Sequence, residues 1–104
     1  MWGMIAKITT APGKRDEMIS ILRGSAANMP GCLSRVVAKD SAEENILWVT
    51  EVWDSQTSHD ASLSLRLVQD AISRAKPIIA NFEKFAATIP VWSTGIYPDR
   101  LACS

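Results

Sequence analysis

Apolar residues follow two spacings along the chain, and each spacing predicts its own kind of element. Strict alternation over residues 2–10 is typical of a strand. Strands are predicted over residues 2–10, 32–39, 46–53 and 82–92. Apolar residues three or four positions apart predict helices over residues 14–29 and 55–75. The order strand, helix, strand, strand, helix, strand predicts an α+β fold of the ferredoxin-like βαββαβ type, with two helices on one face of an antiparallel sheet.

Turn and cap residues punctuate these segments. Ala11-Pro12-Gly13 ends the first strand, and Pro30-Gly31 is expected to end the first helix because proline removes a backbone donor. Ser55 is the expected N-cap of the second helix. Lys76-Pro77 is expected to break that helix, and Pro77–Asn81 is predicted to form a short turn before the last strand.

The predicted strand over residues 46–53 carries large apolar side chains on both faces. These are Ile46, Trp48 and Val52 on one face, and Leu47, Val49 and Trp53 on the other. An antiparallel strand with one solvated face normally alternates more cleanly, and two helices cover only one face of the sheet. Since closed two-fold dimers are the commonest assemblies, we expect a homodimer that joins through the sheet faces.

Length and charge narrow the possible functions. The 104 residues include 11 acidic and 11 basic side chains, so the formal net charge is zero. One domain is expected over residues 1–104, with a core at 2–92 and a C-terminal tail at 93–104. Balanced charge argues against nucleic acid binding, which needs a concentrated basic face. Neither a membrane segment nor a targeting segment is visible, so we expect a cytoplasmic protein with free thiols at Cys32 and Cys103.

Two residue types are candidates for chemistry. The single histidine, His59, lies in the first turn of the second predicted helix, and imidazole accepts a proton near neutral pH. A lone histidine also commonly caps a helix end or bonds to backbone. The four tryptophans either pack in the core and a dimer interface or line a pocket for an aromatic ligand; they are Trp2, Trp48, Trp53 and Trp92. No metal-ligand cluster or phosphate-binding loop accompanies them.

Several short motifs occur in a specific order. They are Ala11-Pro12-Gly13-Lys14, then Met29-Pro30-Gly31-Cys32, then Val49-Thr50-Glu51-Val52-Trp53-Asp54-Ser55 followed by His59. Together, over about residues 2–92, they resemble the antibiotic biosynthesis monooxygenase (ABM) domain. The resemblance implies a dimeric α+β barrel with a pocket between sheet and helices in each protomer. It also implies oxygenation of phenolic or quinol-like aromatics by O₂ with neither metal nor flavin as cofactor.

The resemblance further implies a function and a set of site residues. We predict a cofactor-independent monooxygenase of a small aromatic quinol or polyketide-like phenol, in which the catalytic residue His59 assists deprotonation before reaction with O₂. The substrate-binding candidates are Trp53, Trp48, Asn28, Ser62 and Leu63. Haem is not expected, because Ile72 and Ser62 stand where haem-degrading relatives carry a histidine and a tryptophan. The alternative is a non-catalytic dimeric module of the same fold that binds a small molecule or serves a stress response.

Overall fold

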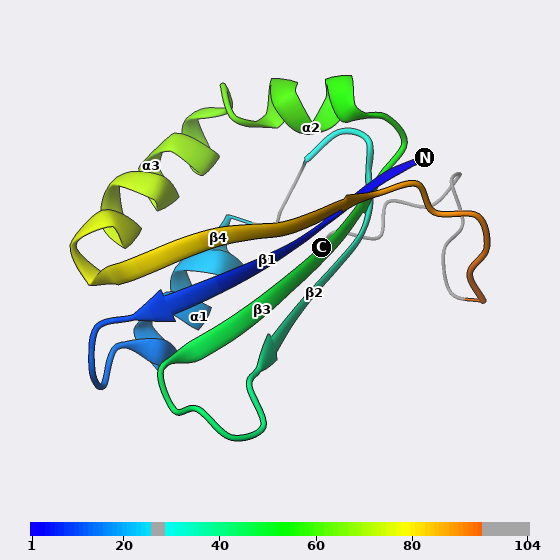
Figure 1. Cartoon of the computed structure of the whole chain (residues 1–104). Helices are drawn as coiled ribbons and strands as arrows, with labels where there is room; N and C mark the ends of the chain where they lie inside the picture. Colours follow the sequence, from blue (N-terminus) through cyan, green and yellow to red (C-terminus); the bar gives the residue numbers. More distant parts are fainter. Residues whose placement is uncertain (26–28, 95–104) are drawn as a thin grey trace.

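The structure is a computed structural model that describes residues 1–25 and 29–94. In chain order its elements are β1 (Trp2–Thr10), α1 (Arg15–Gly24), β2 (Cys32–Lys39), β3 (Ile46–Trp53), α2 (Gln56–Ser62), α3 (Arg66–Ala75), the 3₁₀ helix η1 (Lys76–Ile78) and β4 (Ile79–Thr88). The strands form one antiparallel sheet in the order β2-β3-β1-β4 (Figure 1). The predicted α+β, ferredoxin-like architecture is confirmed.

The first three strands have the bounds that the sequence predicted. Their register brings distant parts of the sequence together. Trp2 on β1 lies opposite Trp53 on β3, and Arg35 on β2 lies opposite Glu51 on β3. Because side chains alternate between faces, all four of these residues fall on the same face of the sheet.

The first helix is shorter than predicted. It ends at Gly24 rather than at Met29, which lies outside any helix. Glycine is a poor helix former, and the hydroxyl of Ser25 donates to the carbonyl of Leu22 at 3.0 Å, as serine does at helix ends. Residues 26–28, which include the candidate Asn28, lie outside the described residues.

The second predicted helix is in fact two helices, α2 and α3, which lie end to end across the sheet (Figure 1). The expected cap is present, since Ser55 accepts a hydrogen bond from the backbone N–H of Ser58 at 3.1 Å. The break follows Ser62, whose carbonyl accepts from the backbone N–H of Leu65 at 3.0 Å, a tight 3₁₀-type bond. Leu65 then takes an extended conformation, which ends the first helix and begins the second.

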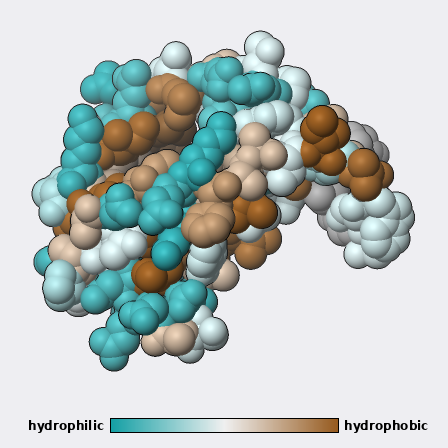
Figure 2. All heavy atoms as spheres, viewed as in Figure 1, coloured by the Kyte–Doolittle hydropathy of each residue, from teal (hydrophilic) through white to brown (hydrophobic). Residues whose placement is uncertain are grey.

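The last strand begins and ends earlier than predicted. Pro77 sits in η1, β4 starts at Ile79, and the strand stops at Thr88, before Pro90. Proline cannot donate to a sheet ladder, which explains why pairing does not continue. The segment after β4 carries exposed apolar side chains that stand clear of the body of the molecule (Figure 2); they are Ile89, Val91 and Trp92.

Helices cover one face of the sheet and leave the other face open. One face packs against α1 and α3 to form the main core, which consists of Met4, Ala6, Ile8, Met18, Ile21, Leu47, Val49, Ala71, Ala75 and Ile78. On the opposite face, Trp48 packs beside Phe85 with ring centroids 5.2 Å apart. Val36 and Phe85 remain 55% and 57% exposed there. The helices therefore leave an apolar face of the sheet open.

The structure bears on two predictions made from the sequence, one about membrane segments and one about the cysteines. No described helix combines the length and the hydropathy needed to cross a membrane. Cys32 is fully buried and disulfide-bonded, which corrects the expectation of a free thiol at that position. It packs in a second small cluster with Met29 and Trp53. Cys103 lies outside the described residues.

Candidate functional site

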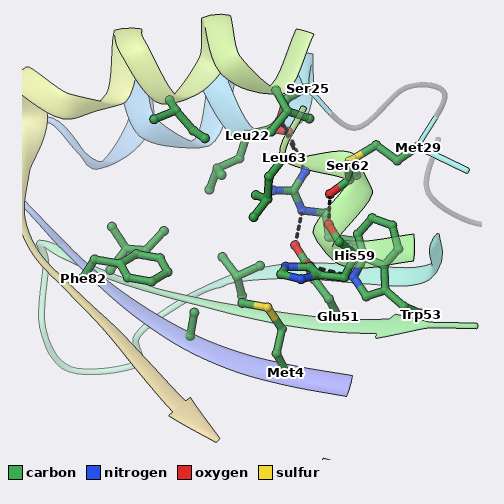
Figure 3. Close-up of a pocket in the computed structure, with 16 residues that line it drawn as sticks. Met4, Leu22, Ser25, Met29, Glu51, Trp53, His59, Ser62, Leu63 and Phe82 are labelled. Carbon is green, nitrogen blue, oxygen red and sulfur yellow. Dashed lines mark hydrogen bonds and ion pairs between the residues drawn. The ribbon is translucent and has the colours of Figure 1, made fainter. Parts of the chain in front are cut away.

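A cavity of about 210 Å³ lies between the helices and the covered face of the sheet (Figure 3). Most of its wall is apolar and comes from β1, β3, β4, α1, α3, the segment before β2 and the α2–α3 junction. These residues are Met4, Ala6, Ile8, Leu22, Met29, Val49, Trp53, Leu63, Val68, Ile72 and Phe82. An apolar cavity of about 150 Å³ is large enough to hold benzene. The space therefore suits an aromatic molecule of one or two rings.

Part of this wall is open to solvent. Leu63, Ile72 and Phe82 line the cavity, yet they are 47%, 43% and 52% exposed. Apolar side chains also gather between the helices and β4 on the surface of the molecule (Figure 2). These three residues therefore form a solvent-exposed part of the cavity wall.

His59, in the last turn of the short helix α2, also lines the cavity. Its ring is held between two indoles, with centroid distances of 4.8 Å to Trp2 and 5.4 Å to Trp53. Its Nδ1 lies 3.2 Å from the carboxylate of Asp60. When Nδ1 carries the proton that this contact requires, Nε2 is the ring atom left to accept one. The imidazole side chain is 17% exposed, so it borders the cavity without being freely solvated.

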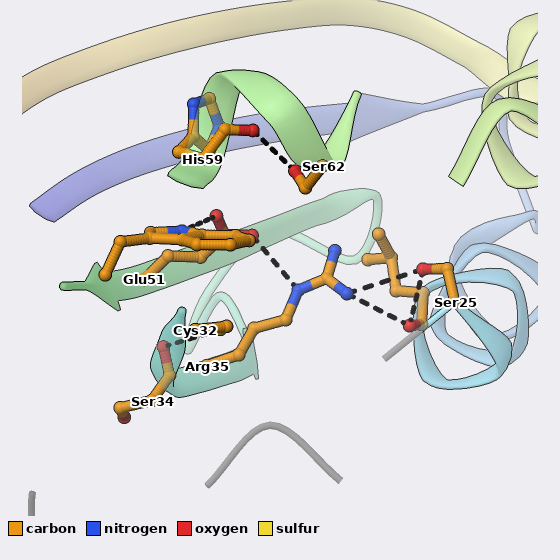
Figure 4. A network of polar contacts seen from close by, with 9 residues as sticks. Ser25, Cys32, Ser34, Arg35, Glu51, His59 and Ser62 are labelled. Carbon is orange, nitrogen blue, oxygen red and sulfur yellow. Dashed lines mark hydrogen bonds and ion pairs between the residues drawn. The ribbon is translucent and has the colours of Figure 1, made fainter. Parts of the chain in front are cut away.

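A polar network crosses the same wall (Figure 4). Glu51 accepts a hydrogen bond from Nε1 of Trp53 at 2.9 Å, and its other oxygen lies 3.1 Å from Nε of Arg35. The N–H of this Nε is not aligned with any acceptor, so the contact with Glu51 is an ion pair rather than a linear hydrogen bond. Nη1 of Arg35 donates to the carbonyl of Leu22 at 3.3 Å and to the hydroxyl of Ser25 at 3.4 Å. The network thus joins β2 and β3 to the end of α1.

The structure brings together four of the six residues that the sequence suggested. His59, Trp53, Ser62 and Leu63 all line the cavity. The hydroxyl of Ser62 donates to the carbonyl of His59 at 2.6 Å, so it braces α2 and leaves only lone pairs toward a ligand. The fifth candidate, Asn28, lies outside the described residues.

The sixth candidate, Trp48, lies on the open face of the sheet and does not line this cavity. Its Nε1 donates to Asp40 at 2.8 Å. This hydrogen bond, followed by those from the backbone N–H groups of Glu43 and Ala42, lowers the pKa of Asp40 from 3.8 to about 2. Trp48 therefore stabilises the hairpin between β2 and β3. It could contact a substrate only if that substrate bound to the open face of the sheet.

Sequence reasoning missed the polar residues of the cavity, Arg35, Glu51 and Ser25. One signal was present. Glu51 shares the face of Val49 and Trp53 in the alternation of β3, so a carboxylate stands in an otherwise buried row. Among the described residues, no group of three or more His, Cys, Asp or Glu side chains could hold a metal ion.

Comparisons with known proteins agree with the resemblance seen in the sequence. A family model described as antibiotic biosynthesis monooxygenase matches residues 1–74. No curated protein matches the chain significantly. The family resemblance is confirmed by this match and by solved structures.

The chain is similar to the crystal structure of a candidate antibiotic biosynthesis monooxygenase from Chloroflexus aurantiacus J-10-fl. The two are 50% identical with a TM-score of 0.89, over 92% of this chain and 98% of that one. A candidate antibiotic biosynthesis monooxygenase from Caulobacter crescentus CB15 is 22% identical with a TM-score of 0.76, over 88% of this chain and 90% of that one. One from Nitrosomonas europaea is 9% identical with a TM-score of 0.80, over 88% and 100%. Because the last two structures are only 22% and 9% identical to this chain, they support only the assignment of the fold.

Proposed function

Since the chain belongs to the antibiotic biosynthesis monooxygenase family, we propose that it is a cofactor-independent monooxygenase of a small aromatic quinol or polyketide-like phenol. His59 removes a hydroxyl proton, and the resulting anion reacts with O₂. The observation that carries the proposal is the apolar cavity of about 210 Å³ with the imidazole of His59 in its wall. An apolar, partly enclosed space with few polar groups is what a planar aromatic ligand requires.

The proposed reaction balances without an external reductant. The substrate O–H bond breaks, its proton passes to Nε2 of His59, and the electron pair stays on the oxygen. The electron-rich ring then reduces O₂. One oxygen atom enters a ring C–H position and the other leaves as water, so a quinol and O₂ become a hydroxyquinone and water. The protein's part is to bind the ring, ionise it and keep water away from the reactive anion.

Oxygen uptake with 1,4-dihydroxynaphthalene, a two-ring quinol of the size that the cavity suits, tests this function, after subtraction of the rate without protein. We expect saturable uptake by the wild-type protein. His59→Ala should lower kcat/KM at least tenfold, because a positioned general base contributes about 10²–10⁴-fold. Trp48→Phe is the matched control, since it alters an aromatic residue outside the cavity and should leave kcat/KM within about twofold.

Two outcomes would contradict the proposal. Uptake that is unchanged in His59→Ala means that His59 is not the base. The absence of uptake with a broad panel of one-ring and two-ring quinols would favour the alternative, a non-catalytic binding module. Size-exclusion chromatography of each variant confirms that the assembly is intact, so that a loss of activity reports on chemistry.

Members of this family are often dimeric. We propose that this chain pairs with a second copy through the open face of the sheet, where Val36 and Phe85 are more than half exposed beside Trp48. A stable interface buries more than about 1,000 Å² in total, and apolar residues dominate its centre. Analytical ultracentrifugation should give twice the chain mass of 11.4 kDa. A monodisperse species at the chain mass would overturn this assembly.

A further inference from the structure

A buried charged pair interrupts the apolar wall of the cavity. The side chains of Arg35 and Glu51 are only 13% and 9% exposed, and both line the cavity. Burying two charges costs desolvation, and apolar side chains of similar volume are commonly as stable or more stable in their place. Fold stability alone is therefore a weak account of this pair, and its position beside the cavity suggests a role toward a ligand.

The three guanidinium nitrogens of Arg35 have different surroundings. Nε faces the carboxylate of Glu51, and Nη1 donates to Leu22 and Ser25 at the end of α1. Nη2 makes no hydrogen bond to any described residue, and it is not among the fully buried polar atoms that lack a partner. In Figure 4 this third nitrogen points from Arg35 toward α2, where Ser62 also lines the cavity. One donor group thus remains open beside the space that a ligand would fill.

We propose that Nη2 of Arg35 binds the ionised oxygen of the substrate phenol and determines that a phenolate is bound in preference to a carboxylate. This inference rests on the proposed function and deepens it. A carboxylate is bound best by two parallel donors of a guanidinium, and here the other two nitrogens are already engaged. A single remaining nitrogen matches a single oxygen atom. The site therefore selects a phenolate over an aromatic carboxylate.

The charges of the site remain balanced during this step. The proton that leaves the substrate oxygen goes to His59, and the negative charge that stays on the oxygen faces Arg35. Glu51 is a positioning residue in this scheme, because its ion pair and the bond from Trp53 hold the guanidinium in place. Such a fixed donor stabilises a developing anion without having to reorganise.

Binding of 4-nitrophenol tests the role of Arg35 without any oxygen chemistry. The ionised probe absorbs at longer wavelength than the neutral form, so a pH titration at saturating protein reports the ionisation of the bound molecule. We expect the wild-type protein to bind the phenolate at least tenfold more tightly than the phenol. The bound probe should then ionise at least one pH unit lower than the free probe. 4-Nitrobenzoate should bind at least tenfold more weakly than the phenolate.

Two variants remove the proposed donor in different ways. Arg35→Met combined with Glu51→Gln removes both charges and so avoids an unpaired buried carboxylate. Arg35→Lys keeps the ion pair with Glu51 and removes the open nitrogen. Both should reduce the preference for phenolate to less than twofold. Arg74→Met is the matched control, because it removes an exposed arginine of α3 that does not line the cavity.

The inference is overturned if the bound probe ionises like the free one, if the preference survives in both Arg35 variants, or if no probe binds. Equal affinity for 4-nitrobenzoate would overturn the selection of a single oxygen. A preference for phenolate in a protein that consumes no O₂ with quinols would support the role of Arg35 and remove the oxygenase. Oxygen consumption without that preference would support the oxygenase and overturn the role of Arg35.

Discussion

Strand β3 carries two tryptophans whose indole N–H groups donate to carboxylates on opposite faces of the sheet. On the covered face, Trp53 donates to Glu51 at 2.9 Å, and both residues are buried beside the cavity. On the open face, Trp48 donates to Asp40 at 2.8 Å, at the hairpin between β2 and β3. The two hydrogen bonds have nearly the same length, so they differ in what else surrounds each carboxylate.

The two carboxylates differ in which neighbouring groups stabilise their negative charge. Glu51 has little water around it and is balanced by the guanidinium of Arg35. For Asp40, hydrogen bonds from the indole of Trp48 and two backbone N–H groups are the main causes that lower its pKa to about 2, and the charge of Lys7 adds only a smaller contribution. A buried acid that depends on one cation should respond sharply to loss of that cation. An accessible acid can exchange any lost partner for water.

The largest effect is expected from Arg35→Met alone. It leaves the carboxylate of Glu51 buried without its cation, and removal of one partner of a buried pair costs about 3–5 kcal/mol. In a domain of about this size each kcal/mol lowers Tm by about 4–8 °C. We therefore expect a fall in Tm of more than about 10 °C, with a matching loss of unfolding free energy in urea.

The double variant Arg35→Met with Glu51→Gln is the control for this prediction. With both charges removed, most of the lost stability should return, because no uncompensated charge stays in the wall. If the single and double variants unfold at the same urea concentration, the cost lies in lost packing. In that case the ion pair between Arg35 and Glu51 does not determine the stability of the covered face.

A smaller contrast is expected when each tryptophan is replaced by phenylalanine. Trp53→Phe removes the N–H that Glu51 accepts, and an unsatisfied buried acceptor costs about 1–3 kcal/mol. Trp48→Phe removes the equivalent donor from Asp40, which water can replace. Urea unfolding followed by circular dichroism should show the larger shift in midpoint for Trp53→Phe. Equal shifts would mean that burial does not distinguish the two faces.

The fold was predictable from the sequence where its signals are local. The bounds of β1 follow from alternation, and those of β2 and β3 follow from apolar segments that turn or polar residues such as Pro30-Gly31 separate. The break between α2 and α3 did not follow, because apolar spacing continues through Leu63 and Leu65 as if one helix ran on. The tight bond at Ser62 that ends α2 is a matter of backbone geometry, which spacing does not encode.

The site was predictable only in part. His59 and Trp53 were suggested by the order of motifs, and both line the cavity. Trp48 is five positions from Trp53, so alternation alone already places the two indoles on opposite faces. Arg35 could not be paired with Glu51 without the register of β2 against β3, which depends on the hairpin that joins them. Polar residues whose role depends on such long-range register are the ones that the sequence conceals.

The smallest expected effect is the pH dependence of the stability that Asp40 contributes on the open face. Because the pKa of Asp40 is about 2 in the folded chain and 3.8 as its ordinary value, its charge stabilises the fold above about pH 4. That contribution is lost as the pH falls through about 2. The Tm difference between wild type and Asp40→Asn should therefore be constant near neutral pH and shrink between pH 4 and pH 2. Trp48→Phe should raise the pKa of Asp40, measured by NMR of its carboxyl carbon, since the indole is the largest cause of the shift. An unchanged titration midpoint in Trp48→Phe would assign the lowered pKa to the backbone N–H groups of the hairpin instead.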